Sequence, residues 1–142
     1  MTIHPRPLGG LDDRVAAFLA GSPFAVVGAS ADRQKYGNKV LRAYMQHGRE
    51  VYPVNPKAGE IEGLAAFMSL SAAARPIHGV SIITPPAVTL AVVEEAGRLG
   101  IRHVWMQPGA ESGASVALAE RLGMNVIGGD ACVLVVLGFR EH

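Results

Sequence analysis

Short apolar runs alternate with longer amphipathic stretches along most of the chain. Five runs rich in β-branched and aromatic residues predict strands at 24–27, 51–54, 80–83, 104–106 and 126–127. Four stretches in which apolar residues recur every three to four positions predict helices at 12–19, 38–47, 87–99 and 115–122. The strand runs are nearly continuous in apolar residues, which is typical of a parallel sheet covered on both faces.

Strands and helices alternate with short connections, which predicts right-handed βαβ units. We therefore expect an α/β fold: an open, doubly wound parallel sheet of about five strands with helices on both faces. One domain is expected over residues 1–142, with residues 1–20 as an N-terminal extension and helix. Segment 58–74 lacks a clear period and is expected to be a loop with a short strand or helical turn. The apolar run 132–137 fits either an edge strand or a helical turn.

The composition narrows the class of protein. The chain has 142 residues, 49% hydrophobic and 18% charged, which suits one domain with a substantial core and argues against disorder. A net charge of +1 creates no field that would attract nucleic acid or an anionic membrane. One cysteine excludes an internal disulfide and a cysteine-based zinc site. No signal peptide or membrane-length apolar run is evident, so we expect a soluble cytoplasmic protein without membrane or nucleic-acid partners.

The end of the first predicted strand is typical of a phosphate-binding turn. Gly28-Ala29-Ser30 follows the strand, and Gly37 lies near the start of the next helix. Glycine permits a sharp turn and close backbone approach, and the helix offers N–H groups and the positive end of its dipole. The pattern is neither the Gly-x-Gly-x-x-Gly fingerprint nor a P-loop. The alternative is an ordinary strand-to-helix turn in which Ser30 or Asn38 caps the helix.

The end of the second strand indicates which nucleotide fits. Sites for NAD usually place a carboxylate there to hold the ribose hydroxyls. Here the chain has Asn55-Pro56-Lys57. A cation at this place favours a phosphorylated ribose, as in NADP or coenzyme A, although Lys57 could also be one more solvated lysine.

The later strand ends point to the same edge of the sheet. Thr84-Pro85-Pro86 follows the third strand, and Pro86 suits the first turn of a helix. Segments 105–112 and 128–132 are also rich in glycine, proline or polar residues. Ligands of doubly wound folds bind at the carboxyl ends of the strands, so these segments predict one crevice.

No catalytic or metal-binding group is predicted. The five histidines lack ligand spacing, and we expect them to be structural or solvated. Cys132 is the single thiol, and its favoured interpretation is a small buried apolar residue.

Taken together, these motifs resemble a known family. Gly28-Ala29-Ser30 with Gly37, the run Tyr52–Lys57, Thr84-Pro85-Pro86, the run Gln107–Ala110, and Asp130 with Cys132 are similar to the small stand-alone coenzyme A-binding proteins. These proteins look like the N-terminal domain of the succinyl-CoA synthetase α subunit and of the NDP-forming acyl-CoA synthetases. The resemblance implies a Rossmann-like fold that binds coenzyme A or acyl-CoA.

The resemblance also implies the binding residues. They are Gly28, Ala29, Ser30, Tyr36, Gly37, Asn55, Pro56, Lys57, Thr84, Pro85, Pro86, Met106, Gln107 and Pro108. The Gly28–Ser30 turn would hold the pyrophosphate, Lys57 the ribose 3′-phosphate, and Thr84 and Pro85 the adenine. Met106 and Gln107 would lie along the rest of the ligand. The alternative interpretation of Cys132 is a thiol near the ligand's sulfur end that exchanges disulfides.

Two functions remain open at this point. The first is a non-catalytic coenzyme A-binding carrier, sensor or regulatory module. In the synthetases a further domain supplies a phosphohistidine, and this sequence shows no such domain, so no ligase activity is expected. Ala131 also stands where the family usually has an arginine. The alternative is an NADP-dependent oxidoreductase or a nucleotide-sensing regulator. A homodimer and another protein partner both remain open.

Overall fold

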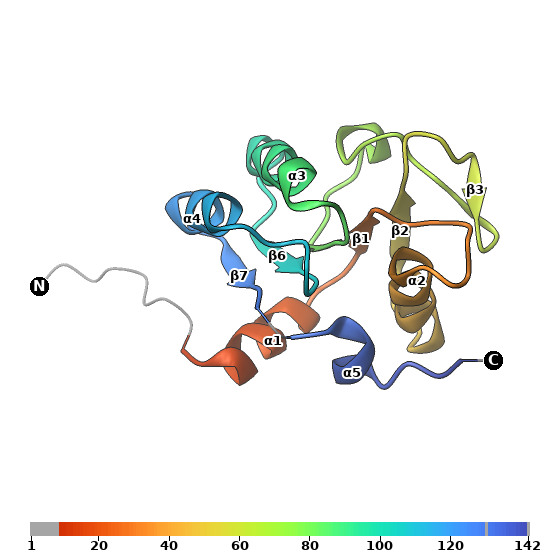
Figure 1. Ribbon diagram of the computed structural model, residues 1–142, viewed down its shortest axis with the longest axis horizontal. Coiled ribbons are helices and arrows are strands. Elements are labelled where there is room, and N and C mark those ends of the chain that lie inside the picture. The colour runs from red at the N-terminus through yellow and green to blue at the C-terminus, as the bar shows by residue number, and fades with distance from the viewer. Residues whose placement is uncertain (1–8, 130, 142) are drawn as a thin grey trace, which may run out of the picture.

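The computed structural model describes residues 9–129 and 131–141. Figure 1 shows a sheet between two groups of helices. In chain order the elements are α1 (Leu11–Leu19), β1 (Phe24–Val27), α2 (Tyr36–Gln46), β2 (Val51–Val54), β3 (Glu60–Ile61), β4 (Leu64–Ala65), a 3-10 turn (Ser71–Ala73), β5 (Gly79–Ile82), α3 (Pro86–Arg98), β6 (His103–Met106), α4 (Gly113–Arg121), β7 (Asn125–Ile127) and α5 (Val133–Leu137).

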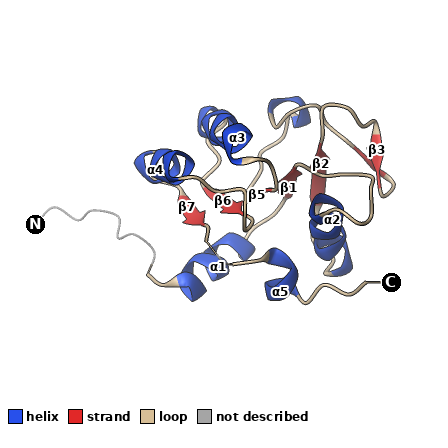
Figure 2. Cartoon of the chain, viewed as in Figure 1, coloured by secondary structure: helices blue, strands red, loops and turns tan. Residues whose placement is uncertain are grey.

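The main sheet has five parallel strands in the order β2-β1-β5-β6-β7. Helices α3 and α4 lie on one face, and α1, α2 and α5 lie on the other (Figures 1 and 2). The expected α/β, doubly wound, Rossmann-like fold is therefore confirmed. The strand order reverses between β1 and β5, and this is the point where such folds open a ligand crevice.

Two hydrophobic clusters, one on each face, hold the sheet. Along β1, Ala25 and Val27 belong to the cluster beneath α3 and α4, whereas Phe24 and Val26 belong to the cluster beneath α1 and α2. Successive side chains of a strand point to opposite faces, so a strand buried on both sides must be apolar throughout. This explains the continuous apolar runs of the sequence.

The amino-terminal edge of the sheet is closed by aromatic rings. Phe18 of α1 lies 5.3 Å from Phe24 and 5.3 Å from Trp105 between ring centroids. It fits over Gly79, where a Cβ atom would come within 2.9 Å of the Phe18 ring. The Nε2–H of His78 donates to the carbonyl oxygen of Phe18 at 2.8 Å. Helix α1 is thus packed onto the starts of several strands.

Most predicted boundaries differ from the structure by only one or two residues. Helix α2 begins at Tyr36, two residues before the predicted start, because Gly37 allows the first turn to lie against the backbone after β1. Segment 58–74 contains the β3–β4 hairpin and the 3-10 turn. Run 132–137 provides helix α5 rather than an edge strand. Across the residues that the model describes, no helix is long and apolar enough to cross a membrane.

Candidate functional site

The candidate site lies at the switch point, where the loops after β1 and β5 touch. Gly28 has a φ of 94°, and a Cβ atom there would lie 2.2 Å from the carbonyl oxygen of Ile83. The N–H of Ile83 donates to the carbonyl oxygen of Val27 at 2.8 Å. Only glycine fits this contact without strain, so the backbones of the two loops can lie directly against each other.

Gly37 brings helix α2 onto the same turn. A Cβ atom on Gly37 would lie 1.9 Å from the carbonyl oxygen of Gly28. The two glycines therefore have separate roles: Gly28 makes the turn, and Gly37 allows the helix to approach it. These are two of the three roles that glycines have in dinucleotide-binding turns.

The β1–α2 loop, residues 28–35, is organised by its own polar side chains. The Oγ of Ser30 accepts from the N–H of Asp32 at 3.0 Å, and Oδ1 of Asp32 accepts from the N–H of Gln34 at 2.9 Å. Tyr36 follows the loop and is 63% exposed, with the Lys39 ammonium 5.8 Å from its ring centroid. Neither Ser30 nor Asn38 caps α2, so the simple capping alternative is wrong.

The turn after β2 is tied to that loop by one amide. Asn55 Nδ2 donates to the carbonyl oxygen of Ala29 at 2.8 Å, and Asn55 Oδ1 accepts from the N–H of Lys57 at 2.8 Å. Pro56 and Lys57 are exposed. Among the described residues, Lys57 forms no ion pair. Asn55 thus positions the Lys57 backbone beside the crevice.

The loop after β5 presents two exposed prolines. Pro86 occupies the first turn of α3, as expected, and Pro85 precedes it. The Thr84 hydroxyl hydrogen-bonds to the Thr89 hydroxyl at 2.7 Å. Thr84 therefore points its Oγ1 toward α3, and its carbonyl oxygen also lies near Thr89 Oγ1, at 3.5 Å.

The predicted residues after β6 lie deeper than the others. Met106 is fully buried and Gln107 is 3% exposed, whereas Pro108 is exposed. Gln107 Oε1 accepts from the N–H of Val133 at 2.8 Å, and Gln107 Nε2 lies 3.3 Å from the Sγ of Cys132. The Gln107 amide thus joins β6 to the start of α5. Cys132 is partly exposed, so the expectation of a buried apolar cysteine is wrong.

Three of the helices that begin at this edge, α2, α3 and α4, differ in their first turns. Helix α4 has a capping box in which the Ser112 and Ser115 side chains bond to each other's backbone N–H. Helix α3 has Pro86 in its first turn, which removes one N–H donor. Helix α2 begins after Lys35 without a side-chain cap. An anion at the start of α2 would find N–H groups that no side chain occupies.

Positive charge gathers at the same edge. The three lysines of the chain are Lys35, Lys39 and Lys57. All three lie in α2, at its N-cap or in the turn after β2. Arg33 is also in the β1–α2 loop and pairs with Glu62 at 3.5 Å. Lys39 lies 4.0 Å from Glu141, so Lys35 and Lys57 are the two lysines without an ion pair among the described residues, and they suit a phosphorylated ligand.

Sequence reasoning missed the hydrogen-bonded group that Asn38 and Arg42 form behind the loop. Asn38 is fully buried, and its Nδ2 donates to the carbonyl oxygen of Ser30 at 2.9 Å and to Glu62 at 3.0 Å. Arg42, 5% exposed, donates to Asn38 Oδ1 at 2.6 Å. A polar pair spaced by four residues on an otherwise apolar helix face was the available signal.

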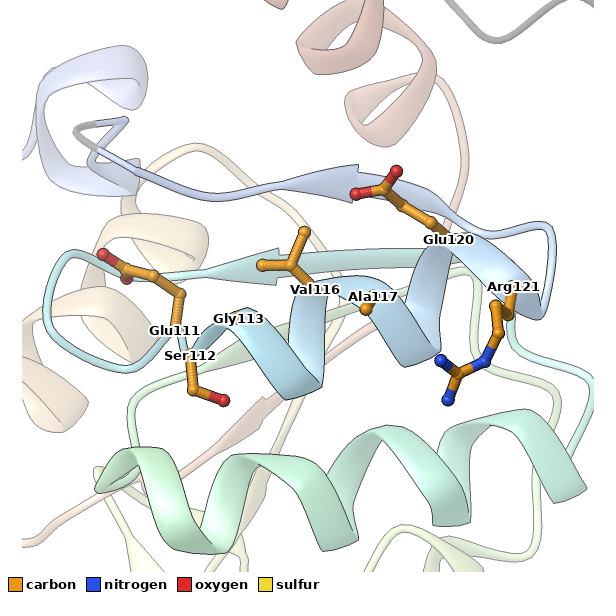
Figure 3. Close-up of a pocket in the computed structure, with 7 residues that line it drawn as sticks. All are labelled: Glu111, Ser112, Gly113, Val116, Ala117, Glu120 and Arg121. Carbon is orange, nitrogen blue, oxygen red and sulfur yellow. The ribbon is translucent and has the colours of Figure 1, made fainter.

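Two surface pockets of the described residues are not lined by the turns after β1 and β5. One lies along α4 (Figure 3). Glu111 and Ser112 line the end of this pocket at the start of the helix, and Glu120 and Arg121 line its other end. The other lies along the edge strand β2, beside Tyr52. The α4 pocket begins at a helix start that is already capped, and its ionic groups lie at opposite ends. The crevice is the better candidate because the glycine turns and uncapped helix converge there.

The five-strand topology and the glycine turn at the switch point together define a Rossmann-like α/β protein. The chain belongs to the coenzyme A binding domain family, whose model matches residues 22–138. The comparison therefore confirms the resemblance that the motifs suggested.

The chain is similar to solved proteins of about its own length and to part of longer ligase subunits. A conserved hypothetical protein from Pyrococcus furiosus is 38% identical, with a TM-score of 0.75, over 80% of this chain and 97% of that one. A hypothetical protein from Pyrococcus horikoshii is 28% identical, with a TM-score of 0.83, over 94% of this chain and 95% of that one. The α subunit of ADP-forming acetate–CoA ligase II from Pyrococcus furiosus is 29% identical over 73% of this chain. The match covers only 25% of that subunit.

Proposed function

We propose that this chain binds coenzyme A, free or as an acyl-CoA, and acts as a carrier, sensor or regulatory module. The family match over residues 22–138 carries the proposal. The geometry agrees with it, because the turn at Gly28, the uncapped start of α2 and the lysines meet at the switch point. We also propose that residues 1–142 act as a single domain.

The proposed ligand follows the crevice from one strand end to the next. Its pyrophosphate lies against Gly28, Ala29 and Ser30, beside Tyr36 and Gly37. Its 3′-phosphate meets Lys57, which Asn55 and Pro56 hold in the turn after β2. The adenine lies against the turn formed by Thr84, Pro85 and Pro86, and the pantetheine arm passes the backbone of Gln107 and Pro108. Met106 supports this path from below, because its side chain is buried.

Calorimetry with coenzyme A, NAD and NADP tests the proposal. Coenzyme A should bind more tightly than NAD, because Lys57 stands where NAD sites hold ribose hydroxyls with a carboxylate. It should also bind more tightly than NADP, because the matching family is a coenzyme A binding domain. Native mass spectrometry of the purified protein should show co-purified coenzyme A or acyl-CoA. Tighter binding of NAD would overturn the proposal, and tighter binding of NADP would favour an oxidoreductase or a nucleotide-sensing regulator.

A catalytic role is tested separately. The aligned segments cover a quarter or less of two ADP-forming acetate–CoA ligase relatives. We expect the chain alone to form no acyl-CoA from an acid, a nucleoside triphosphate and coenzyme A. Product above the background of a heat-inactivated sample would show that the chain has an active site of its own.

A further inference from the structure

Arg42 is a nearly buried cation with a partner for each nitrogen of its guanidinium. Its side chain is 5% exposed. Nε donates to Asn38 Oδ1 at 2.6 Å, Nη1 to Glu141 at 2.9 Å, and Nη2 to the carbonyl oxygen of Arg33 at 3.2 Å. A buried charge is tolerated only when it is paired and hydrogen-bonded, so these contacts define where the three partners lie.

The partners belong to three separate parts of the chain. Asn38 is one turn earlier on α2, and Arg33 is in the β1–α2 loop. Glu141 is in the segment after α5, which passes beside α2 (Figure 1). That segment also places the ring of Phe139 5.0 Å from the centre of the Arg42 guanidinium. Arg42 therefore joins the loop at the candidate site to residues about one hundred positions later in the chain.

Asn38 carries the contact further into the loop. Because its Oδ1 accepts from Arg42, its Nδ2 faces the other way and donates to the carbonyl oxygen of Ser30 and to Glu62. Two backbone carbonyl groups of the loop, those of Ser30 and Arg33, are thus held from the Arg42 side. Fixing the carbonyl groups of a short loop also fixes the directions of its N–H groups.

The charge balance depends on Glu141. The hydrogen bond from Arg42, supported by the charges of Arg42, Lys39 and Arg33, lowers the pKa of the Glu141 carboxyl. Glu141 is therefore ionised at neutral pH and compensates the buried guanidinium. Without this carboxylate the cation would retain only neutral oxygen partners among the described residues.

We propose that Arg42 is the positioning residue of the β1–α2 loop and that Glu141 docks segment 138–141 onto it, so that undocking this segment loosens the ligand site. The ligand half of this statement rests on the proposed function. A protein or ligand that draws segment 138–141 away from Arg42 would lower the affinity for the pyrophosphate.

Limited trypsin digestion of the ligand-free protein tests the coupling between the segment and the loop. Arg33 and Lys35 are exposed cleavage sites in the loop, and the carbonyl group of the Arg33–Gln34 bond is the one that Arg42 holds. Glu141→Gln removes the charge and keeps the shape. It should increase the cleavage rate after Arg33 and Lys35 about two- to fivefold, with little change in the thermal unfolding midpoint. Glu94→Gln, an exposed carboxylate on α3, is the matched control and should leave the rate unchanged.

Affinity measurements test whether the contacts of Arg42 and Glu141 affect ligand binding. Glu141→Gln should lower the affinity for coenzyme A about two- to fivefold. Arg42→Lys, which lacks the forked guanidinium group, should lower it about tenfold. The affinity for dephospho-coenzyme A should fall by the same factors, because this ligand retains the pyrophosphate. Equal cleavage and equal affinity in Glu141→Gln and Glu94→Gln would overturn the coupling. A wild type that does not bind coenzyme A would instead overturn the proposed function, whatever the cleavage rates show.

Discussion

The two edges of the sheet are held by different kinds of contact. At the amino-terminal edge, the rings of Phe18, Phe24 and His78 pack against one another, and α1 covers the strand starts. At the carboxyl-terminal edge the loops are held by single amides, those of Asn38, Asn55 and Gln107. Buried rings contribute stability through area and packing. Directed hydrogen bonds contribute little net stability but fix backbone directions, which is what a ligand site requires.

This difference predicts whether a mutation should change stability or ligand discrimination. Changes at the amino-terminal edge should lower stability and leave ligand discrimination intact. Changes at the carboxyl-terminal edge should alter discrimination at a smaller cost in stability.

The largest effect is expected from Phe18→Ala. Its ring is fully buried between Phe24 and Trp105, and removing such a ring leaves a cavity. The free energy of unfolding should fall by about 3–5 kcal/mol, as measured by denaturant titration. Leu11→Ala, at a position on the same helix that is 51% exposed, is the control and should change stability by less than about 0.5 kcal/mol. A folded Phe18→Ala protein with altered coenzyme A selectivity would contradict the assignment of ligand discrimination to the carboxyl-terminal edge alone.

Lys57→Ala should act on discrimination alone. Loss of one charge-assisted contact with the 3′-phosphate should cost about 1.5–3 kcal/mol, or about ten- to a hundredfold in affinity for coenzyme A. Dephospho-coenzyme A, which lacks that phosphate, should bind the variant and the wild type alike. Added salt should reduce the wild-type preference, because Lys57 is exposed.

Arg121→Ala, an exposed cation on α4, is the control for Lys57→Ala in the same calorimetric titrations. It should bind both ligands as the wild type does. If Lys57→Ala weakens both ligands equally, the lysine does not contact the 3′-phosphate and the proposed place of the ribose is wrong.

The sequence predicted the fold more completely than the site. Continuous apolar runs and the alternation with helical periods were enough to predict the sheet, because burial on both faces requires such runs. Gly28 and Gly37 were found because a turn and a close approach require glycine. The Arg42 and Glu141 pair was not found. Its members are far apart in the sequence, and a buried arginine looks like a solvated one until its partners are known.

Gly37→Ala, at the carboxyl-terminal edge, should lower both stability and ligand affinity. The added Cβ would lie 1.9 Å from the carbonyl oxygen of Gly28, so α2 must move away from the turn. Stability should fall by about 1–3 kcal/mol, and affinity for coenzyme A should fall with it. Gly113→Ala, also in the first turn of a helix but with open space around its Cβ, is the matched control. It should be neutral or stabilising by up to about 1 kcal/mol. Equal stability of the two variants would show that α2 does not press on the turn.

The smallest effect is expected from pH at the amino-terminal edge. The His78 and His103 rings lie 4.3 Å apart, and Asn125 Nδ2 lies 3.1 Å from His103 Nδ1, which must be unprotonated to accept its hydrogen bond. Burial, followed by the charges of His78 and Arg102, lowers the pKa of His103 below the ordinary histidine value of about 6.5.

Because the pKa of His103 is lower in the folded than in the unfolded state, the unfolded chain binds more protons between the two values. The contribution of His103 to stability is therefore present above about pH 6.5 and is lost as the pH falls toward the lowered value. The thermal unfolding midpoint should decline from pH 7.5 to 5.5, less steeply in His103→Gln than in the wild type. His47→Gln, at an exposed histidine after α2, should keep the wild-type slope. If all three proteins show the same slope, His103 does not make this edge sensitive to acid, and the decline comes from other groups.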